Sequence, residues 1–82
     1  MRLPRDLSGH DLARALGTCG YEITRQTGSH LRLTTRTAGE HHVTIPAHAS
    51  LRIGTLAAVL DEVARHLGMS RNALVEKLFG SH

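Results

Sequence analysis

The tripeptide Gly28-Ser29-His30 lies between two segments in which polar and apolar residues alternate. A histidine that follows a glycine turn at the start of a strand is held on a rigid edge and is open to solvent. Its unperturbed pKa of about 6.5 suits it to proton transfer near neutral pH. Three arginines on the adjoining segments carry the positive charge that phosphoryl oxygens attract. They are Arg25, Arg32 and Arg36. This combination is typical of metal-independent cleavage of a phosphodiester bond.

Two simpler interpretations compete with this chemistry. Taken alone, the tripeptide favours a His30 that is only a polar residue opening a strand, because short motifs often match by chance. The basic face could also be incidental to a structural protein. Such a protein would bind no RNA even at low salt, where phosphate contacts are strongest.

The other residue types that do chemistry form no recognisable set. His41, His42 and His48 are close in sequence, and no cysteine or carboxylate joins them at a ligand spacing. Neighbouring residues of a strand also point to opposite faces, so His41 and His42 cannot easily share one ion. Neither Cys19 nor Ser29 belongs to a visible acid–base set, and there is no glycine-rich phosphate loop. We therefore expect no metal site and no cofactor.

The start of the long helix in the second half of the chain offers a further phosphate contact. Arg52 and Thr55 lie near its N-terminus, where backbone N–H groups attract anions. Thr55 could equally be the residue that caps this helix. His48 precedes both residues and could be a second titrating group. We expect His10 and His66 to be solvated on the polar faces of helices.

Length and composition predict one small domain with an anionic partner. The chain has 82 residues and a net charge of +3, and its ten basic residues include a single lysine, Lys77. Arginine forms forked contacts with phosphate, which favours an anionic partner over a neutral one. We expect residues 1–82 to form one domain with its core at about residues 8–79. Because only Tyr21 and Phe79 are aromatic, the core must consist of Leu, Ile, Val and Ala.

The sequence also carries signals of cellular location. Cys19 is the single cysteine, so no internal disulfide can form and a reducing cytoplasm is the simplest compartment. No apolar run approaches the ~20 residues that span a bilayer. The first residues lack the apolar centre of a signal peptide. We therefore expect a soluble cytoplasmic protein with no membrane contact, in which Cys19 is a small buried side chain.

Ser8 predicts the start of a first helix. Asp11 follows three residues later, as in a capping box, and Leu7 and Leu12 occupy the positions of a hydrophobic staple. An apolar stripe continues to Cys19. Gly20 is the expected C-terminal stop of this helix.

Three alternating segments then predict strands over residues 21–27, 30–36 and 41–45. Residues 28–29 and 37–40 are the turns between them. Strands joined by such short turns must form an antiparallel meander, because parallel pairing needs long crossovers. Pro46 ends the third strand because it cannot donate to the sheet ladder.

The alternation assigns the side chains to two faces of this sheet. Leu31 and Leu33 face the core, and His30 and Arg32 lie on the opposite, solvent-exposed face. In the first strand, Tyr21 and Ile23 are expected inward and Glu22, Thr24 and Gln26 outward. In the third strand, Val43 and Ile45 are expected inward and His42 and Thr44 outward. One face of the sheet is apolar and one polar, so helices should cover only the apolar face.

Two helices are predicted after the sheet. An apolar stripe at helical spacing predicts the first, from about Gly54 to Leu67, and Gly68 ends it. Ser70 is the expected cap of a last helix that runs through Phe79. The predicted fold class is α+β, with the order α-β-β-β-α plus a short C-terminal helix.

Short motifs succeed one another along the chain. They are Leu7-Ser8-Gly9, Gly20-Tyr21, Arg25 to His30, Val43 to His48 and Gly54-Thr55-Leu56. This succession resembles the HicA toxins of bacterial type II toxin–antitoxin systems, over roughly Ser8 to Phe79. Gly-Ser-His followed by Pro-x-His and Gly-Thr-Leu is a fairly specific signature.

The resemblance implies a double-stranded-RNA-binding-like fold and ribosome-independent cleavage of mRNA. It implies that His30, at the position of the family's motif histidine, is catalytic and that Gly28 and Ser29 shape its turn. It also implies inhibition by a HicB-type antitoxin, encoded beside the toxin, in a toxin–antitoxin hetero-oligomer.

Two positions depart from the family pattern. Thr27 replaces a frequent lysine before Gly-Ser-His, and Ala47 replaces a frequent basic residue within Pro-x-His. Both changes remove positive charge beside the site, so a non-catalytic RNA-binding module of the same fold is the alternative. We predict a metal-independent endoribonuclease with His30 as general acid or base. Its expected RNA contacts are Arg25, Arg32, Arg36, His48 and Arg52.

Overall fold

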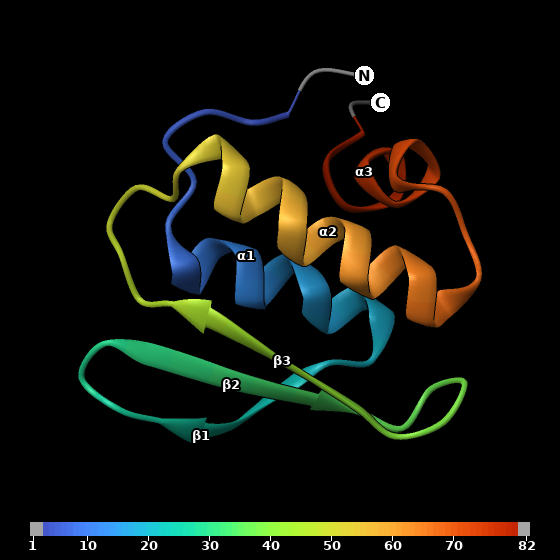
Figure 1. Ribbon diagram of the computed structural model, residues 1–82, viewed down its shortest axis with the longest axis horizontal. Coiled ribbons are helices and arrows are strands. Elements are labelled where there is room, and N and C mark those ends of the chain that lie inside the picture. The colour runs from blue at the N-terminus through green and yellow to red at the C-terminus, as the bar shows by residue number, and fades with distance from the viewer. Residues whose placement is uncertain (1–2, 81–82) are drawn as a thin grey trace.

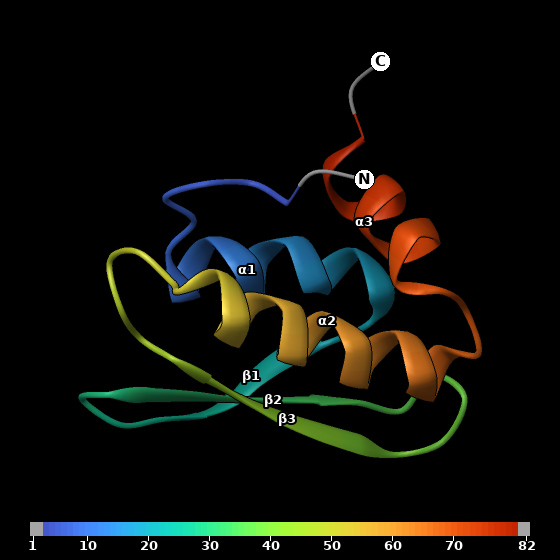
Figure 2. The same ribbon diagram turned by 45° about the horizontal axis from the view of Figure 1, so that its top comes forward.

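The computed structural model describes residues 3–80 and contains one open sheet with helices on one side. The strands are β1 (Glu22–Gln26), β2 (His30–Thr35) and β3 (His41–Pro46), antiparallel and in the order β1-β2-β3. The helices are α1 (Gly9–Leu16), α2 (Ile53–Leu67) and α3 (Arg71–Phe79), and the 3-10 turn η1 (Gly17–Cys19) follows α1. Figures 1 and 2 show α1 and α2 side by side above the sheet, whose other face is uncovered. The predicted α+β class, element order and double-stranded-RNA-binding-like arrangement are confirmed.

The start of α1 has the predicted capping box. The Asp11 N–H donates to Ser8 Oγ at 2.9 Å, and the Ser8 N–H donates to the Asp11 carboxylate at 3.2 Å. These bonds satisfy two N–H groups that a helix start leaves unpaired. They also lower the pKa of the Asp11 carboxyl, with a smaller contribution from the Arg14 charge. The α-helix ends at Leu16, earlier than predicted, and the single turn η1 leads to Gly20, which has a φ of 89°.

The two faces of β2 match the predicted alternation. Leu31 and Leu33 are fully buried against the helices, whereas His30 and Arg32 are exposed on the uncovered face of the sheet. We call this uncovered surface the open face. In β3, Val43 and Ile45 are likewise buried, while His42 and Thr44 lie on the open face. Pro46 is the last residue of β3, as predicted.

The alternation predicted for β1 is wrong beyond Thr24. The strand register pairs Ile23 with Leu33 but Arg25 with Arg32, so Thr24 is an extra residue, a β-bulge. Residues that pair directly share a face, so the bulge moves Arg25 to the open face. It also turns Gln26, which pairs with Leu31, toward the helix side. Ile23 faces the helix side as predicted, but it is 42% exposed on this edge strand.

The connection to α2 differs from the prediction at one residue. The helix begins at Ile53 and its N-cap is Arg52, which makes no capping bond with its side chain. Thr55 therefore lies inside the first turn and is not the cap. Gly68 ends the helix with a φ of 70°, and the Ala73 N–H donates to Ser70 Oγ at the start of α3, both as predicted.

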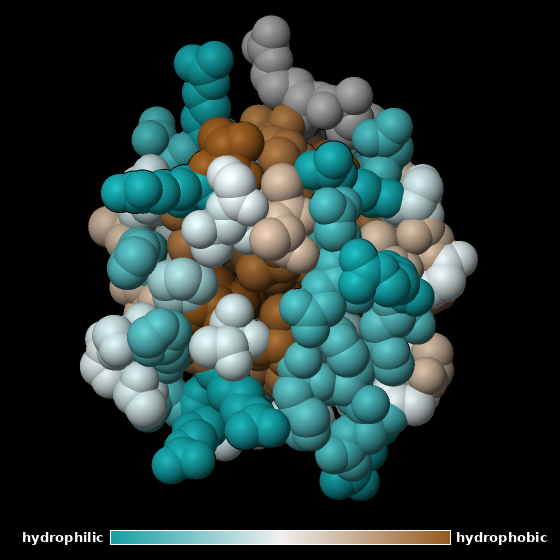
Figure 3. All heavy atoms as spheres, in the orientation of Figure 1, coloured by the Kyte–Doolittle hydropathy of each residue, from teal (hydrophilic) through white to brown (hydrophobic). Residues whose placement is uncertain are grey.

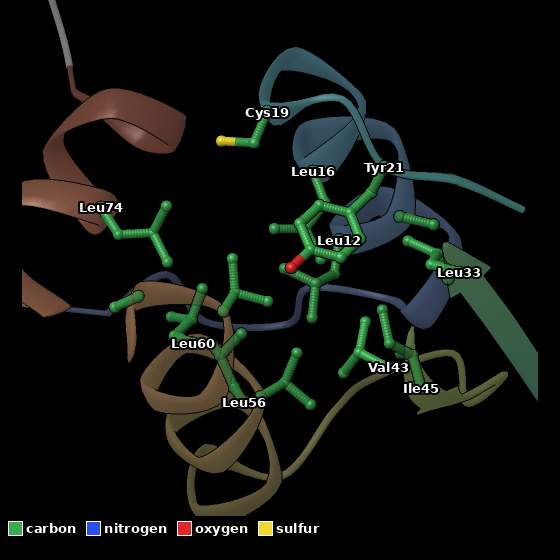
Figure 4. Close-up of a cluster of buried hydrophobic side chains, with 14 of the residues drawn as sticks. Leu12, Leu16, Cys19, Tyr21, Leu33, Val43, Ile45, Leu56, Leu60 and Leu74 are labelled. Carbon is green, nitrogen blue, oxygen red and sulfur yellow. The ribbon is translucent and has the colours of Figure 1, made fainter. Parts of the chain in front are cut away.

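The core lies between the sheet and the helices and is almost entirely aliphatic. Leu12 and Leu16 of α1 and Leu56 and Leu60 of α2 form one cluster with the inward side chains of β2 and β3, and Leu74 of α3 extends this cluster on the side away from the sheet (Figure 4). Tyr21 is the only aromatic side chain in this buried set, and Cys19 is buried as predicted. Hydrophilic side chains cover much of the face in Figure 3, with apolar atoms visible in its middle and upper part. Within residues 3–80, no helix is long and apolar enough to cross a bilayer.

Candidate functional site at the His30 end of the open face

His30 is the first residue of β2 and follows a turn that local hydrogen bonds hold in place. The Thr27 N–H donates to the His30 carbonyl at 2.9 Å, and the His30 N–H donates to Thr27 Oγ1 at 3.1 Å. Thr27 is one of the two positions at which the sequence departs from the pattern of the family that it resembles. Its hydroxyl fixes the backbone of the histidine, so this departure exchanges a charge for a backbone contact.

The His30 ring is oriented by its neighbour Ser29. Ser29 Oγ lies 2.9 Å from Nδ1, and the hydrogen bonds within residues 3–80 leave Nε2 open to a substrate. When Nδ1–H of the neutral ring donates to the serine, Nε2 is free to act as a base. When Nε2 has taken a proton, the ring is an imidazolium in which Nδ1–H still donates to the serine and Nε2–H can act as an acid. One contact therefore serves both directions of proton transfer.

A side chain at Gly28, two residues before His30, would project into open space. Its φ is not positive, and a Cβ at this position would meet no atom within 4 Å. Neither the backbone conformation nor a neighbouring atom of the chain therefore requires glycine here. The close approach of a ligand to the backbone is a further use of glycine.

Arg25 and Arg32 face each other across β1 and β2 on the open face. Arg32 is two residues from His30 on the same strand, so their Cα atoms are about 6.7 Å apart. No acidic side chain within residues 3–80 forms an ion pair with either arginine. Like charges directly opposite in a sheet repel, and a bound anion would remove that cost.

The segment after β3 lies against the His30 turn. The Ala47 N–H donates to the Ser29 carbonyl at 2.9 Å, and the Gly9 N–H donates to the His48 carbonyl at 3.0 Å. A Cβ on Gly9 would come within 2.1 Å of the Pro46 carbonyl oxygen, so only glycine allows α1 to approach the end of β3 this closely.

The remaining predicted RNA contacts divide between the two ends of the sheet. The side chain of His48 is exposed and follows Ala47, which contacts the His30 turn, whereas the exposed Arg52 follows Leu51, whose N–H donates to the Leu7 carbonyl; neither side chain hydrogen-bonds to His30. Arg36 lies just past the opposite end of β2. The structure therefore gathers Arg25 and Arg32 beside His30 and leaves Arg36 separate.

Two groups of side chains were missed in the sequence. On the open face, Thr34 Oγ1 lies 2.8 Å from both Thr24 Oγ1 and His42 Nδ1, and His42 Nε2 lies 3.0 Å from the Glu40 carboxylate. Cross-strand pairing could have suggested the Thr34–His42 contact. The bulge that brings Thr24 to the same hydroxyl leaves no signal in the alternation.

The second missed group joins the sheet to α2. His41 Nδ1 lies 2.8 Å from the Tyr21 hydroxyl, and His41 Nε2 lies 3.3 Å from the Glu62 carboxylate. His66 stacks on His41 with ring centres 4.4 Å apart, and its Nε2 lies 2.9 Å from the Thr37 carbonyl. The prediction that His66 is merely solvated is therefore wrong. The exposed His10 lies 3.5 Å from Gln26.

No group of three or more His, Cys, Asp or Glu side chains in the described part of the chain is placed to share a metal ion. Burial raises the pKa of Tyr21 to about 12, with smaller contributions from Cys19 and Glu62. Tyr21 therefore stays protonated and can donate to His41. This second group is a structural link between layers.

The fold and the site define a small α+β protein with a histidine and arginines on the open face of a three-stranded sheet. The sequence model of the family described as HicA toxin of bacterial toxin–antitoxin matches residues 9–69, well over half of the chain. The protein therefore belongs to the HicA toxin family of bacterial toxin–antitoxin systems. None of the curated proteins and none of the solved structures compared with the chain matches it.

Proposed function

We propose that this toxin is a metal-independent endoribonuclease that cleaves mRNA in the cytoplasm and is neutralised by a HicB-type antitoxin. The observation that supports the activity best is the placement of His30 beside Arg25 and Arg32 on the open face. A titrating group and uncompensated positive charge on one solvent-exposed surface are what cleavage of a phosphodiester requires. Membership of the HicA family supports the same activity.

The proposed reaction is attack of a ribose 2′-hydroxyl on the adjacent phosphorus. The new P–O bond forms as the bond to the 5′ oxygen breaks, which leaves a 2′,3′-cyclic phosphate and a 5′-hydroxyl. Acting as a base, His30 Nε2 takes the proton of the 2′-hydroxyl while water protonates the leaving 5′ oxygen; acting as an acid, protonated His30 gives its Nε2 proton to the 5′ oxygen while water takes the 2′-hydroxyl proton. Arg32 and Arg25 neutralise charge on the phosphoryl oxygens, and His48 and Arg52 contact the flanking strand.

The deciding experiment compares the wild-type protein with His30→Ala on a labelled single-stranded RNA in the presence of EDTA. We expect cyclic-phosphate products from the wild type and a loss of rate of roughly 100-fold or more in the variant, the usual range for a general acid or base. His10→Ala, which removes an exposed histidine from α1, is the matched control and should cleave normally. Activity that disappears in EDTA and returns with magnesium would refute the metal-independent mechanism.

A non-catalytic RNA-binding module is the second candidate. It is favoured by the fact that no second titrating side chain hydrogen-bonds to His30 within residues 3–80. It predicts salt-sensitive RNA binding, no cleavage products, and equal growth inhibition by the wild type and His30→Ala in a bacterial host. The neutralising partner is tested separately, by co-expression with the protein encoded by the neighbouring gene.

A further inference from the structure

A polar hollow lies at the end of the open face that is opposite to the Gly28 turn. It has a volume of about 550 Å³ and is lined by Gly20, Glu22, Thr24, Thr34, Arg36 and Thr37. We call it the Glu22–Arg36 hollow. Thr34 and His30 lie on the same face of β2, four residues apart, which is about 13 Å along a strand. The hollow and His30 are therefore two positions on one continuous surface.

The hydroxyl wall of this hollow is held in place before any ligand arrives. Thr34 Oγ1 is shared between Thr24 and His42 at 2.8 Å each, and the Glu40 carboxylate holds the other ring nitrogen of His42 at 3.0 Å. The floor needs glycine at Gly20, which has a φ of 89° and where a Cβ would come within 2.5 Å of Thr37 Oγ1. A preorganised wall reduces the cost of ordering side chains when a ligand binds.

The chemistry of the lining excludes two simple ligands. Glu22 is an acceptor with a negative charge, so it repels a bare phosphate. An apolar ligand would leave Glu22, Arg36 and the hydroxyls without partners. The edge of a nucleobase presents donors and acceptors side by side. Carboxylates accept from base amino groups, and arginine donates to base carbonyl and ring nitrogen acceptors.

The Arg25–Arg32 pair links the hollow to the proposed reaction centre. Both arginines lie on the open face between His30 and Thr34. A stacked single strand advances about 3.4 Å per nucleotide, so the ~13 Å between the two ends corresponds to a few nucleotides. A strand laid along β2 would place its phosphates on the arginine pair and a base at each end.

We propose that the Glu22–Arg36 hollow binds one unstacked base of single-stranded RNA, a few nucleotides from the bond at His30, and sets a base preference. The base it accepts has an amino donor for Glu22 and an acceptor for Arg36, which adenine, guanine and cytosine each present in a different arrangement and uracil, without an amino group, does not. This inference rests on the proposed function for the identity of the strand. The base-reading step itself does not depend on cleavage.

The test measures binding of four short RNAs that differ in one base, using the His30→Ala protein so that no strand is cut. A preference of roughly tenfold for one base is expected, as for a single good base contact. Glu22→Gln replaces the charged acceptor by a neutral amide, and Thr34→Val removes the hydroxyl that contacts Thr24 and His42. Each variant should reduce that preference severalfold. Thr44→Val makes the same change on the same face outside the hollow and should keep the preference.

Two results would overturn the inference: equal binding of all four RNAs, or a Glu22→Gln protein that keeps the full preference. Circular dichroism and a thermal melt of each variant separate these results from unfolding. The proposed nuclease fails in a different way, when the wild type binds with the base preference but yields no cleavage products. Absence of RNA binding at low salt refutes both proposals together.

Discussion

At the scale of single residues, the turn before His30 combines a glycine, which has no side chain, with two polar side chains. Gly28 occupies the turn before His30 in a conformation that any residue could adopt, and a side chain there would meet no other atom within 4 Å. Ser29 and Thr27 meanwhile make the contacts that fix the ring and its backbone. Ser29 and Thr27 therefore hold the histidine, and Gly28 leaves open space in the same turn.

Replacement of Gly28 by alanine tests whether that room serves the substrate. We expect unchanged or slightly higher stability, by up to about 1 kcal/mol, because alanine restricts the unfolded chain without a clash in the folded one. RNA cleavage should fall at least severalfold if the phosphate backbone approaches this turn. Gly17→Ala is the control, because its Cβ also meets nothing within 4 Å and η1 is remote from His30. Thermal melts measure the stability of both variants, and cleavage assays measure their rates. Full activity in Gly28→Ala would contradict a close approach of the RNA backbone to this turn.

The charge of Arg32 makes a separate prediction about salt. Each cation that neutralises a phosphate of a single strand contributes about 0.7 to the slope of log affinity against log salt. Arg32→Gln should therefore weaken RNA binding at low salt and reduce this slope by about 0.7. Arg65→Gln removes an exposed arginine from α2 and should leave the slope unchanged. A salt titration by fluorescence anisotropy measures both, and equal slopes in wild type and Arg32→Gln would exclude a phosphate contact.

At the scale of elements, the bulge in β1 decides which side chains meet. Without the bulge, regular alternation through Thr24 would turn Arg25 to the helix side and Gln26 to the open face. The bulge brings two arginines opposite each other at the price of their mutual repulsion. Bulges commonly re-aim side chains next to functional sites.

The close approach of α1 to β3 fixes the same end of the sheet. Gly9→Ala would place a Cβ within 2.1 Å of the Pro46 carbonyl oxygen. This clash is relieved only by a shift of the backbone, because neither atom belongs to a flexible side chain. We expect destabilisation of about 1–3 kcal/mol, as for an overpacked core. RNA cleavage measured below the melting temperature should also fall, because the shifted Pro46 pairs with His30. Denaturant unfolding compares the variant with Gly17→Ala, which should be neutral, and equal stability of the two would contradict the prediction.

Elements and faces were predictable from the sequence where one residue type decides the local structure. Ser8, Ser70 and Gly68 fix helix ends through their own side chain or backbone, and Leu31 and Leu33 fix a face by burial. That His30 lies on the open face follows from the same alternation.

The prediction failed where the outcome depends on tertiary partners. The bulge at Thr24 follows from the register against β2, which alternation within one strand cannot report. The position of His66 follows from carbonyls of a distant turn and from the ring of His41. The alternative that Thr55 caps α2 is excluded, because α2 begins at Ile53. Its N-cap is Arg52, whose side chain makes no capping hydrogen bond.

At the scale of the whole molecule, stability and chemistry occupy opposite faces of one sheet. The buried core lies entirely on the helix side, whereas the site residues are exposed on the open face or at its ends. We therefore expect substitutions on the open face to change the proposed RNA contacts at little cost to folding. The two layers are joined by Tyr21, whose hydroxyl meets His41 of β3, and by Glu62 and His66 of α2.

This link gives stability a distinctive dependence on alkaline pH. The folded-state pKa of Tyr21 is about 12, above its ordinary value of 10.0, because burial disfavours the charged phenolate. Above pH 10 the unfolded chain releases the phenolic proton while the folded chain keeps it. The unfolded state then binds fewer protons, so the free energy of unfolding falls as pH rises from 10 to 12. The loss should reach up to about 3 kcal/mol, from 1.36 kcal/mol per unit of pKa difference.

Tyr21 is the only tyrosine and the chain has no tryptophan, so tyrosinate absorbance reports this group alone. We expect a midpoint near pH 12 in the folded protein and near pH 10 in denaturant. Tyr21→Phe should cost about 1 kcal/mol at neutral pH, because it leaves His41 Nδ1 without its partner. It should also abolish the part of the alkaline loss that belongs to Tyr21. A folded-state midpoint near 10 would mean that the phenol is solvated and that its contact with His41 does not help to join the two layers.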